Sequence, residues 1–119
     1  MGASEFITLS KGRTADEAFN AAQSQAYYDH GHSGYSGTIA EKPSFVEFQR
    51  PKGVRTATIQ TMIDDLTWVE DDESLNRLER KYPRWPFRRM FHIWDDKWGP
   101  SVCIEFKPTQ YMFCGMAST

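Results

Sequence analysis

Histidine, aspartate and glycine gather in one short stretch, YDHGHSGYSGTIAEK at residues 28–42. Neutral imidazole and carboxylate groups are ligands for zinc and iron, so Asp29, His30 and His32 are a candidate metal set. Further ligands must then come from His92, the cysteines or other carboxylates. The alternative is that these histidines only end a helix and make local hydrogen bonds. The residues of this ligand-loop hypothesis are His30, His32, Tyr35 and Thr38.

Glycine recurs at every third position of the same stretch, at Gly31, Gly34 and Gly37. Small residues let backbone amides approach an anion, which is how phosphate loops work. Phosphate loops lead from a strand into the positive N-terminal end of a helix. This stretch instead leaves the C-terminal end of an expected helix, so the pattern favours a structural connection over a phosphate site.

A second stretch, RLERKYPRWPFRR at residues 77–89, carries six basic residues against one glutamate and interleaves three aromatic residues. Basic groups neutralise phosphate and aromatic rings stack on bases, which is the composition of a single-strand binding surface. Trp, Tyr and Arg also dominate protein interfaces. The alternative is a solvated face partly paired with the acids at 64–73. Together with a tryptophan-bearing turn at 94–100, the candidate binding residues are Arg77, Arg80, Lys81, Arg84, Trp85, Arg88, Arg89 and Trp98.

The two cysteines, Cys103 and Cys114, are too few for a disulfide framework and lack the CxxC spacing of a zinc site. We expect both to be buried thiols. A catalytic pair of either cysteine with His92 requires a proximity that sequence spacing does not give.

Length and composition indicate one domain with an aromatic core. The chain has 119 residues, of which 39% are hydrophobic and 14% aromatic. Its net charge of −2 gives no global attraction to nucleic acid or to an anionic membrane. We find no secretory leader and no apolar run of about 20 residues. The sequence therefore predicts a soluble protein of the cytoplasm without a membrane partner.

Local signals place a strand and a long helix in the first third of the chain. Residues 5–9 favour a strand because β-branched and aromatic residues cluster there. Thr14 and Glu17 form a capping-box pattern, alanines and one phenylalanine follow at helical spacing, and Gly31 suits a left-handed helix end. We expect this helix to lie across a sheet, followed by strands at 38–40 and 45–49.

The remaining chain shows helical and then alternating spacing. Apolar residues at 59, 62, 63 and 66 predict a second helix, and residues 72–82 predict a third. From residue 87 the pattern changes to a period of two residues, and we expect strands at 87–93, 102–106 and 111–116 in an antiparallel meander. Cys103 and Cys114 are then possible neighbours across its last turn.

Segments from both ends of the chain resemble a group of small proteins encoded by bacteriophages and related mobile elements. These segments are GASEF at residues 2–6, GRTADEAFNAA at 12–22, HGHSGYSGTIAEK at 30–42, DKWGP at 96–100 and the closing FCGMAST. The resemblance implies an accessory protein made in the cytoplasm of a bacterial host cell. It transfers no catalytic residues.

The sequence thus predicts a single α+β domain over residues 1–119. We expect an antiparallel sheet of five or six strands, one long helix on a face and two shorter helices. The leading functional hypothesis is a non-enzymatic accessory protein that binds a bacterial host protein and inhibits or redirects host or defence machinery. A nucleic-acid-binding module using residues 77–89, and a small ligand-binding or metal-binding enzyme at His30 and His32, remain alternatives. No cofactor is predicted.

Overall fold

Four strands form one mixed sheet in the computed structural model, which describes residues 2–119. The strands are β1 (Ala3–Lys11), β2 (Phe45–Phe48), β3 (Ser101–Lys107) and β4 (Gln110–Ser118). Their order across the sheet is β1-β4-β3-β2. β4 pairs antiparallel with both β1 and β3, whereas β2 pairs parallel with β3.

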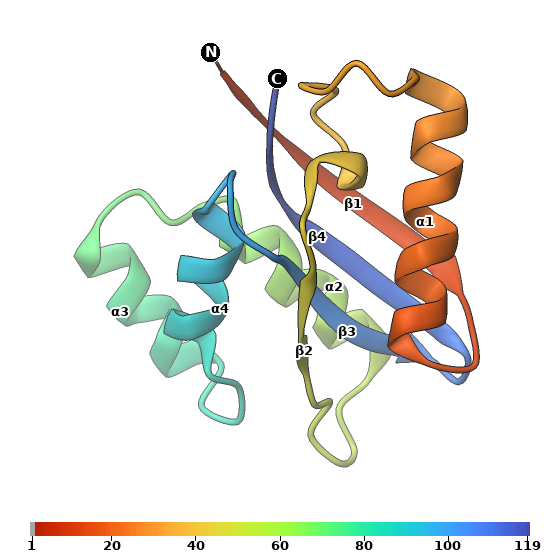
Figure 1. The fold of residues 1–119 in the computed structure, drawn as a ribbon. Coiled ribbons are helices and arrows are strands. Elements are labelled where there is room, and N and C mark those ends of the chain that lie inside the picture. Colours follow the sequence, from red (N-terminus) through yellow and green to blue (C-terminus); the bar gives the residue numbers. More distant parts are fainter. Residues whose placement is uncertain (1) are drawn as a thin grey trace.

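Helices cover both faces of this sheet (Figure 1). On one face lies α1 (Ala15–His30), followed in the chain by the short 3-10 helix η1 (Ile39–Glu41). The other face carries α2 (Thr56–Leu66) and α4 (Phe87–Asp95), and α3 (Asp72–Lys81) packs beside α4 on the side away from the sheet. These three helices form the crossover from β2 to β3, which parallel neighbours require. The result is a single α+β domain.

The core consists of two apolar layers separated by the sheet. Alternate residues of β4 serve different layers because successive side chains point to opposite faces. Met112 and Cys114 pack with the three-helix side, while Tyr111 and Phe113 pack with α1. α1 approaches the sheet through alanines, with Phe19 as its large buried side chain.

The helices predicted from local signals are confirmed. The Thr14 hydroxyl caps α1 by accepting a hydrogen bond from the Glu17 amide (3.2 Å), and Gly31 ends the helix with a φ of 79°. α2 and α3 lie where the apolar spacing places them. The cap of α3 is Asp71, which exchanges hydrogen bonds with Ser74.

The predicted strand at 87–93 is wrong, because this segment is helix α4. Phe87, Met90 and Trp94 are the buried residues, and their separations of three and four are helical. Arg89 is exposed, so the alternation that we inferred from residues 87, 89, 91 and 93 does not describe one buried face. The crossover therefore has three helices where we expected two.

The predicted strand at 38–40 is also wrong. The Thr38 hydroxyl accepts a hydrogen bond from the Ala40 amide (3.2 Å), which caps the 3-10 turn of η1. Without these two strands the sheet has four, not five or six, and the parallel β2 makes it mixed and not antiparallel.

The two cysteines are buried and free, as expected. They are diagonal neighbours in the sheet, since Val102 pairs with Cys114 and Cys103 pairs with Phe113. Their side chains join different core layers, which separates the thiols by the sheet. Burial also raises the pKa of both thiols.

No helix within residues 2–119 is long and apolar enough to cross a membrane.

Candidate functional site

Two exposed aromatic rings meet at one end of the molecule, and we call this pair, Tyr35 and Trp98, the aromatic corner. Tyr35 lies in the loop after α1, and Trp98 lies in the turn between α4 and β3. The ring centroids are 6.5 Å apart at an interplanar angle of 87°, an edge-to-face arrangement. The residues remain 53% and 58% exposed, so the contact leaves most of both rings open to solvent.

A buried lysine fixes the turn that carries Trp98. Lys42 reaches this turn from the segment between η1 and β2, and its Nζ donates to the carbonyls of Asp96 (2.9 Å) and Gly99 (3.2 Å). Within the turn, the Trp98 amide donates to Asp96 Oδ1 (3.0 Å). Both ends of the turn are therefore attached to one side chain from a distant part of the chain.

The burial of Lys42 has an energetic cost. The residue is 2% exposed, and its Nζ lies 6.0 Å from the centroid of the Phe6 ring. Burial lowers the pKa of Lys42, while the charge of Asp96 acts in the opposite direction. A buried ammonium group is unfavourable unless it is well bonded. The fold thus accepts a desolvated charge where that charge positions an exposed tryptophan.

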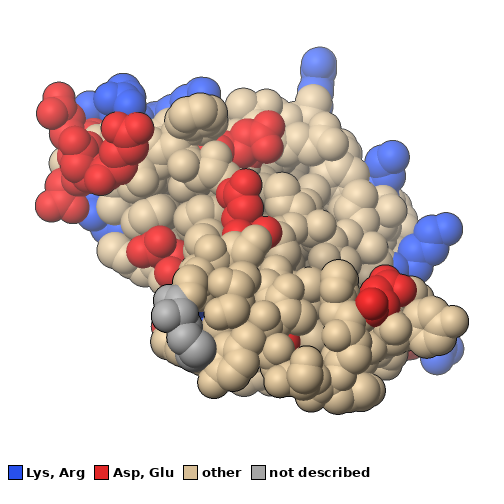
Figure 2. Space-filling view, turned by 90° about the horizontal axis from the view of Figure 1, so that it is seen from above, with Lys and Arg blue, Asp and Glu red and all other residues tan. Residues whose placement is uncertain are grey.

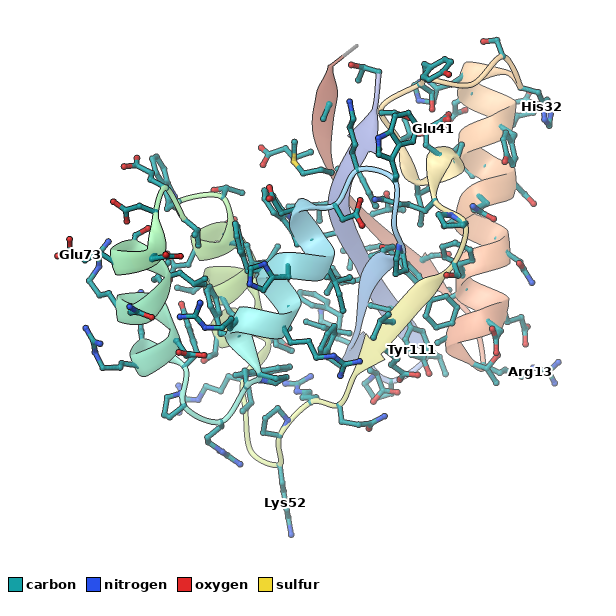
Figure 3. All side chains as sticks on the ribbon, turned by 60° about the vertical axis from the view of Figure 1, so that its left-hand side comes forward. Arg13, His32, Glu41, Lys52, Glu73 and Tyr111 are labelled. Carbon is teal, nitrogen blue, oxygen red and sulfur yellow. The ribbon has the colours of Figure 1, made fainter. Side chains whose placement is uncertain are left out.

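The loop that carries Tyr35 is held from two sides. Glu41 of η1 accepts hydrogen bonds from the Ser36 amide (3.1 Å) and the Ser36 hydroxyl (2.7 Å), and the Gly37 amide donates to Ser118 of β4 (2.8 Å). Figure 3 shows Glu41 beside this loop. Desolvation acts to raise the pKa of Glu41, but hydrogen bonds from Ser36 and Tyr35 outweigh it, and the net shift is downward.

Tyr35 has an uncommon backbone conformation, with a φ of 56°. Bulky residues rarely occupy this left-handed region, whereas glycine enters it at little cost. Such a conformation costs on the order of 1 kcal/mol. The ring does not fill the core but lies exposed beside Trp98.

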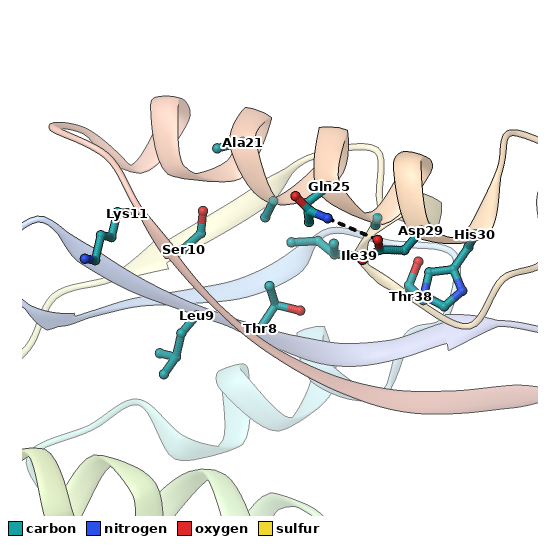
Figure 4. Close-up of a pocket in the computed structure, with 12 residues that line it drawn as sticks. Thr8, Leu9, Ser10, Lys11, Ala21, Gln25, Asp29, His30, Thr38 and Ile39 are labelled. Atoms are coloured by element: carbon teal, nitrogen blue, oxygen red, sulfur yellow. Dashed lines mark hydrogen bonds between the residues drawn. The ribbon is translucent and has the colours of Figure 1, made fainter.

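The ligand-loop residues do not converge on one point. His30, Thr38 and Asp29 line a groove of about 440 Å³ between α1 and β1, in which Gln25 donates to Asp29 (3.1 Å; Figure 4). His32 stacks on the Tyr27 ring at 4.5 Å instead (Figure 3). No group of three potential ligands suited to a metal ion occurs among residues 2–119.

The basic residues of 77–89 lie on α3, on α4 and in the loop between them, and we call them the basic surface. They are Arg77, Arg80, Lys81, Arg84, Arg88 and Arg89. Two of them form ion pairs, Lys81 with Asp65 (2.8 Å) and Arg88 with Glu79 (3.4 Å). Acidic side chains also gather at the α3 end of the molecule (Figure 2), which lowers the positive potential there.

Trp85 differs from the expectation that it lies on the same surface. It is 6% exposed and belongs to the three-helix core layer. Next to it, a hollow of about 350 Å³ brings together Arg55, Lys81 and Arg84. Arg55 was not among the predicted residues, because it precedes α2 and is distant in sequence from 77–89.

Sequence reasoning missed the buried Lys42. Lysine is ordinarily a surface residue, so neither its type nor its neighbours in sequence indicate a buried contact with Asp96. Comparisons of the chain with protein-family models, with curated proteins and with solved structures find no match.

Proposed function

We propose that this protein is a non-enzymatic accessory protein that binds another protein through the aromatic corner. The partner is a protein of a bacterial host, and binding inhibits or redirects that protein. The observation that carries the proposal is the exposed Trp98 ring on a turn fixed by the buried Lys42. Tryptophan and tyrosine supply much of the binding energy at protein interfaces.

Rigid support of the two rings favours binding over a merely exposed loop. Ordering a flexible loop on association lowers affinity, and a loop that is already ordered avoids this loss. Lys42 holds the Trp98 turn, and Glu41 and β4 hold the segment after Tyr35. The aromatic corner is therefore preorganised in the sense that interfaces require.

Capture of partners from bacterial lysate tests this proposal with a matched pair of tryptophans. Trp68 is 67% exposed in the segment between α2 and α3, far in sequence from the aromatic corner. We expect Trp98→Ala to lose a specifically captured protein and Trp68→Ala to retain it. The captured protein is then purified, and its affinity for each variant is measured by calorimetry. Equal binding by wild type and Trp98→Ala contradicts the proposal.

The role of Lys42 is tested separately from the rings themselves. Lys42→Met keeps an unbranched apolar stem but removes both hydrogen bonds to the turn. We expect this variant to bind more weakly than wild type and to lose more entropy on binding, because its turn must become ordered on association. Calorimetry measures both effects. If folded Lys42→Met protein binds with unchanged affinity, preorganisation of the Trp98 turn does not contribute to binding.

The hollow beside Trp85 favours a second candidate function, binding of single-stranded nucleic acid. Arg55, Lys81 and Arg84 line this hollow, and cations that converge on a concave surface can contact phosphate. Binding is then expected to weaken steeply with salt, and Arg84→Ala is expected to reduce the salt slope by about 1. Arg13→Ala, on an arginine that is exposed elsewhere, is the control. No binding to oligonucleotides at low salt excludes this function.

A further inference from the structure

The outer edge of β1 is open along its whole length. β1 is the first strand in the sheet order, and within residues 2–119 only β4 pairs with it. It has nine residues, about 30 Å of strand, and pairs with β4 without a bulge. Figure 4 looks onto this edge, with α1 above it and β4 behind. A long regular edge is a template for another strand.

The hydrogen bonds to β4 determine which groups of β1 point outward. The Gly12 amide donates to Thr109 (3.1 Å), and the Thr119 amide donates to Gly2 (3.2 Å), at the two ends of the ladder. Hydrogen-bonded and non-hydrogen-bonded pairs alternate along an antiparallel ladder. Even-numbered residues therefore direct their backbone groups to β4. The N–H and C=O groups of residues 3, 5, 7, 9 and 11 point away from the sheet.

The same strand exposes two large apolar side chains. Ile7 is 53% exposed and Leu9 is 46% exposed, on the face of the sheet opposite α1. Their neighbours on β4, Cys114 and Met112, are covered by the three-helix layer. That layer ends at β4, so the open backbone edge coincides with an apolar stripe that it leaves uncovered.

We propose that β1 pairs antiparallel with β1 of a second copy of this chain. A two-fold axis at Thr8 joins the two sheets into one of eight strands. In this register Ile7 faces Leu9 of the second copy, and Glu5 faces Lys11 of the second copy. The strand is thus complementary to itself in charge and in apolar pattern, which a two-fold interface requires. Moving the axis to Ile7 or Leu9 places a charge opposite an apolar residue.

Backbone geometry selects the same register independently. Odd-numbered residues face odd-numbered residues when the axis passes through Thr8, and these are the residues with outward backbone groups. Four such pairs, each exchanging two bonds, give on the order of eight hydrogen bonds. Thr8 then faces its own copy as a non-hydrogen-bonded pair, the closer of the two pair types.

The other edge of the sheet lacks these properties. β2 has only four residues, and Pro43 and Pro51 stand close to its ends. Short edge strands and prolines prevent strand addition. β1 contains no proline, so association is directed to one edge. Pairing through β1 adds to the proposed binding function, since the aromatic corner lies outside the strand and each copy retains its own.

Exchange of the two charges tests the register in the full 119-residue chain. Glu5→Lys alone and Lys11→Glu alone place like charges opposite each other, and each is expected to weaken the dimer on the order of tenfold. An equal mixture of the two variants restores both opposite-charge pairs and is expected to form a heterodimer. The double variant is expected to recover the homodimer. Sedimentation equilibrium over a wide concentration range measures all four, with circular dichroism as the check on folding.

A cysteine at the two-fold axis tests the pairing without relying on charge. Thr8→Cys places two thiols opposite each other at a Cα separation of about 4.5 Å, within disulfide range. Mild oxidation is expected to give a covalent dimer, while Ser10→Cys on the same face remains monomeric under denaturing conditions. The native cysteines are buried and do not compete. Wild-type protein that is monomeric at every concentration, or cross-linking by Ser10→Cys in place of Thr8→Cys, overturns the proposal.

Discussion

The two faces of the sheet are packed by different means. α1 approaches its face through Ala18, Ala22 and Ala26, so the helix backbone lies close to the strands. The three helices on the other face contribute large side chains, among them the fully buried Phe87. The helix on one face therefore contributes mainly small side chains, and the helices on the other face contribute large ones. We expect the two layers to respond oppositely to changes in side-chain size.

Polar contacts differ between the faces as well. On the α1 side, Gln23 donates to the carbonyls of Ile39 (3.2 Å) and Lys42 (2.7 Å), and Tyr27 donates to Ala40 (3.1 Å). These bonds attach α1 to the segment that positions both aromatic rings. On the other side, Asp65 joins α2 to the end of α3. The α1 layer thus supports the aromatic corner, while the three-helix layer mainly supplies core volume.

The largest expected loss of stability comes from creating a cavity in the three-helix layer. Phe87 is fully buried and stacks on Tyr82, with ring centroids 5.5 Å apart. Phe87→Ala is expected to lower the free energy of unfolding by about 3–5 kcal/mol, measured by urea denaturation. Phe87→Leu keeps most of the volume and is expected to cost clearly less. Similar losses for both variants contradict a layer that depends on volume.

Overpacking the α1 layer is expected to have a smaller effect. Ala18 is fully buried, and its carbonyl accepts a hydrogen bond from the Ser10 hydroxyl (2.8 Å). Ala18→Leu is expected to cost about 1–3 kcal/mol, because the helix must move away from the sheet. Ala21→Leu, on the exposed side of the same helix, is the control and is expected to be nearly neutral. If Ala18→Leu costs no more stability than Ala21→Leu, the α1 layer does not depend on close approach of the helix to the sheet.

Sequence patterns predicted the helices whose signals are local. The cap at Thr14 and the helix end at Gly31 involve residues within a few positions of each other. The prediction for residues 87–93 was wrong because the spacing of their apolar residues fits both a strand and a helix. Only packing against the core shows that Phe87 and Met90 share a face. The prediction of a strand at 38–40 was wrong because the Thr38 hydroxyl accepts a hydrogen bond from the Ala40 amide. Such a local hydrogen bond competes with strand formation and is not part of β propensity.

The candidate site was predictable only in part. The tryptophan-bearing turn at 94–100 was singled out, but composition does not say which tryptophan is exposed. Trp85 is buried and Trp98 is not, because of where the three helices meet the sheet. The contact of Lys42 with Asp96 joins residues 54 positions apart. Such contacts follow from the topology of the chain, and the parallel placement of β2 beside β3 was itself not predicted.

The smallest expected effect concerns the polar link between α2 and α3. Asp65 accepts hydrogen bonds from Lys81 Nζ (2.8 Å) and the Tyr82 hydroxyl. Desolvation acts to raise the pKa of Asp65, but these bonds outweigh it, and the net shift is below the ordinary value of 3.8. A lowered pKa means that the unfolded chain binds the proton more readily. The stabilisation is therefore present above the ordinary pKa and is lost as the pH falls through the folded value.

Asp65→Asn is accordingly expected to lower the free energy of unfolding by about 1 kcal/mol at neutral pH. The difference from wild type is expected to shrink on acidification below about pH 4, because wild type loses the same charge there. Urea denaturation at a series of pH values measures it, with Asp64→Asn at the exposed neighbour as the control. A difference that does not change with pH shows that the link is held by shape and not by charge. The contact made by Asp65 would then depend on side-chain shape, as the packing around Phe87 does.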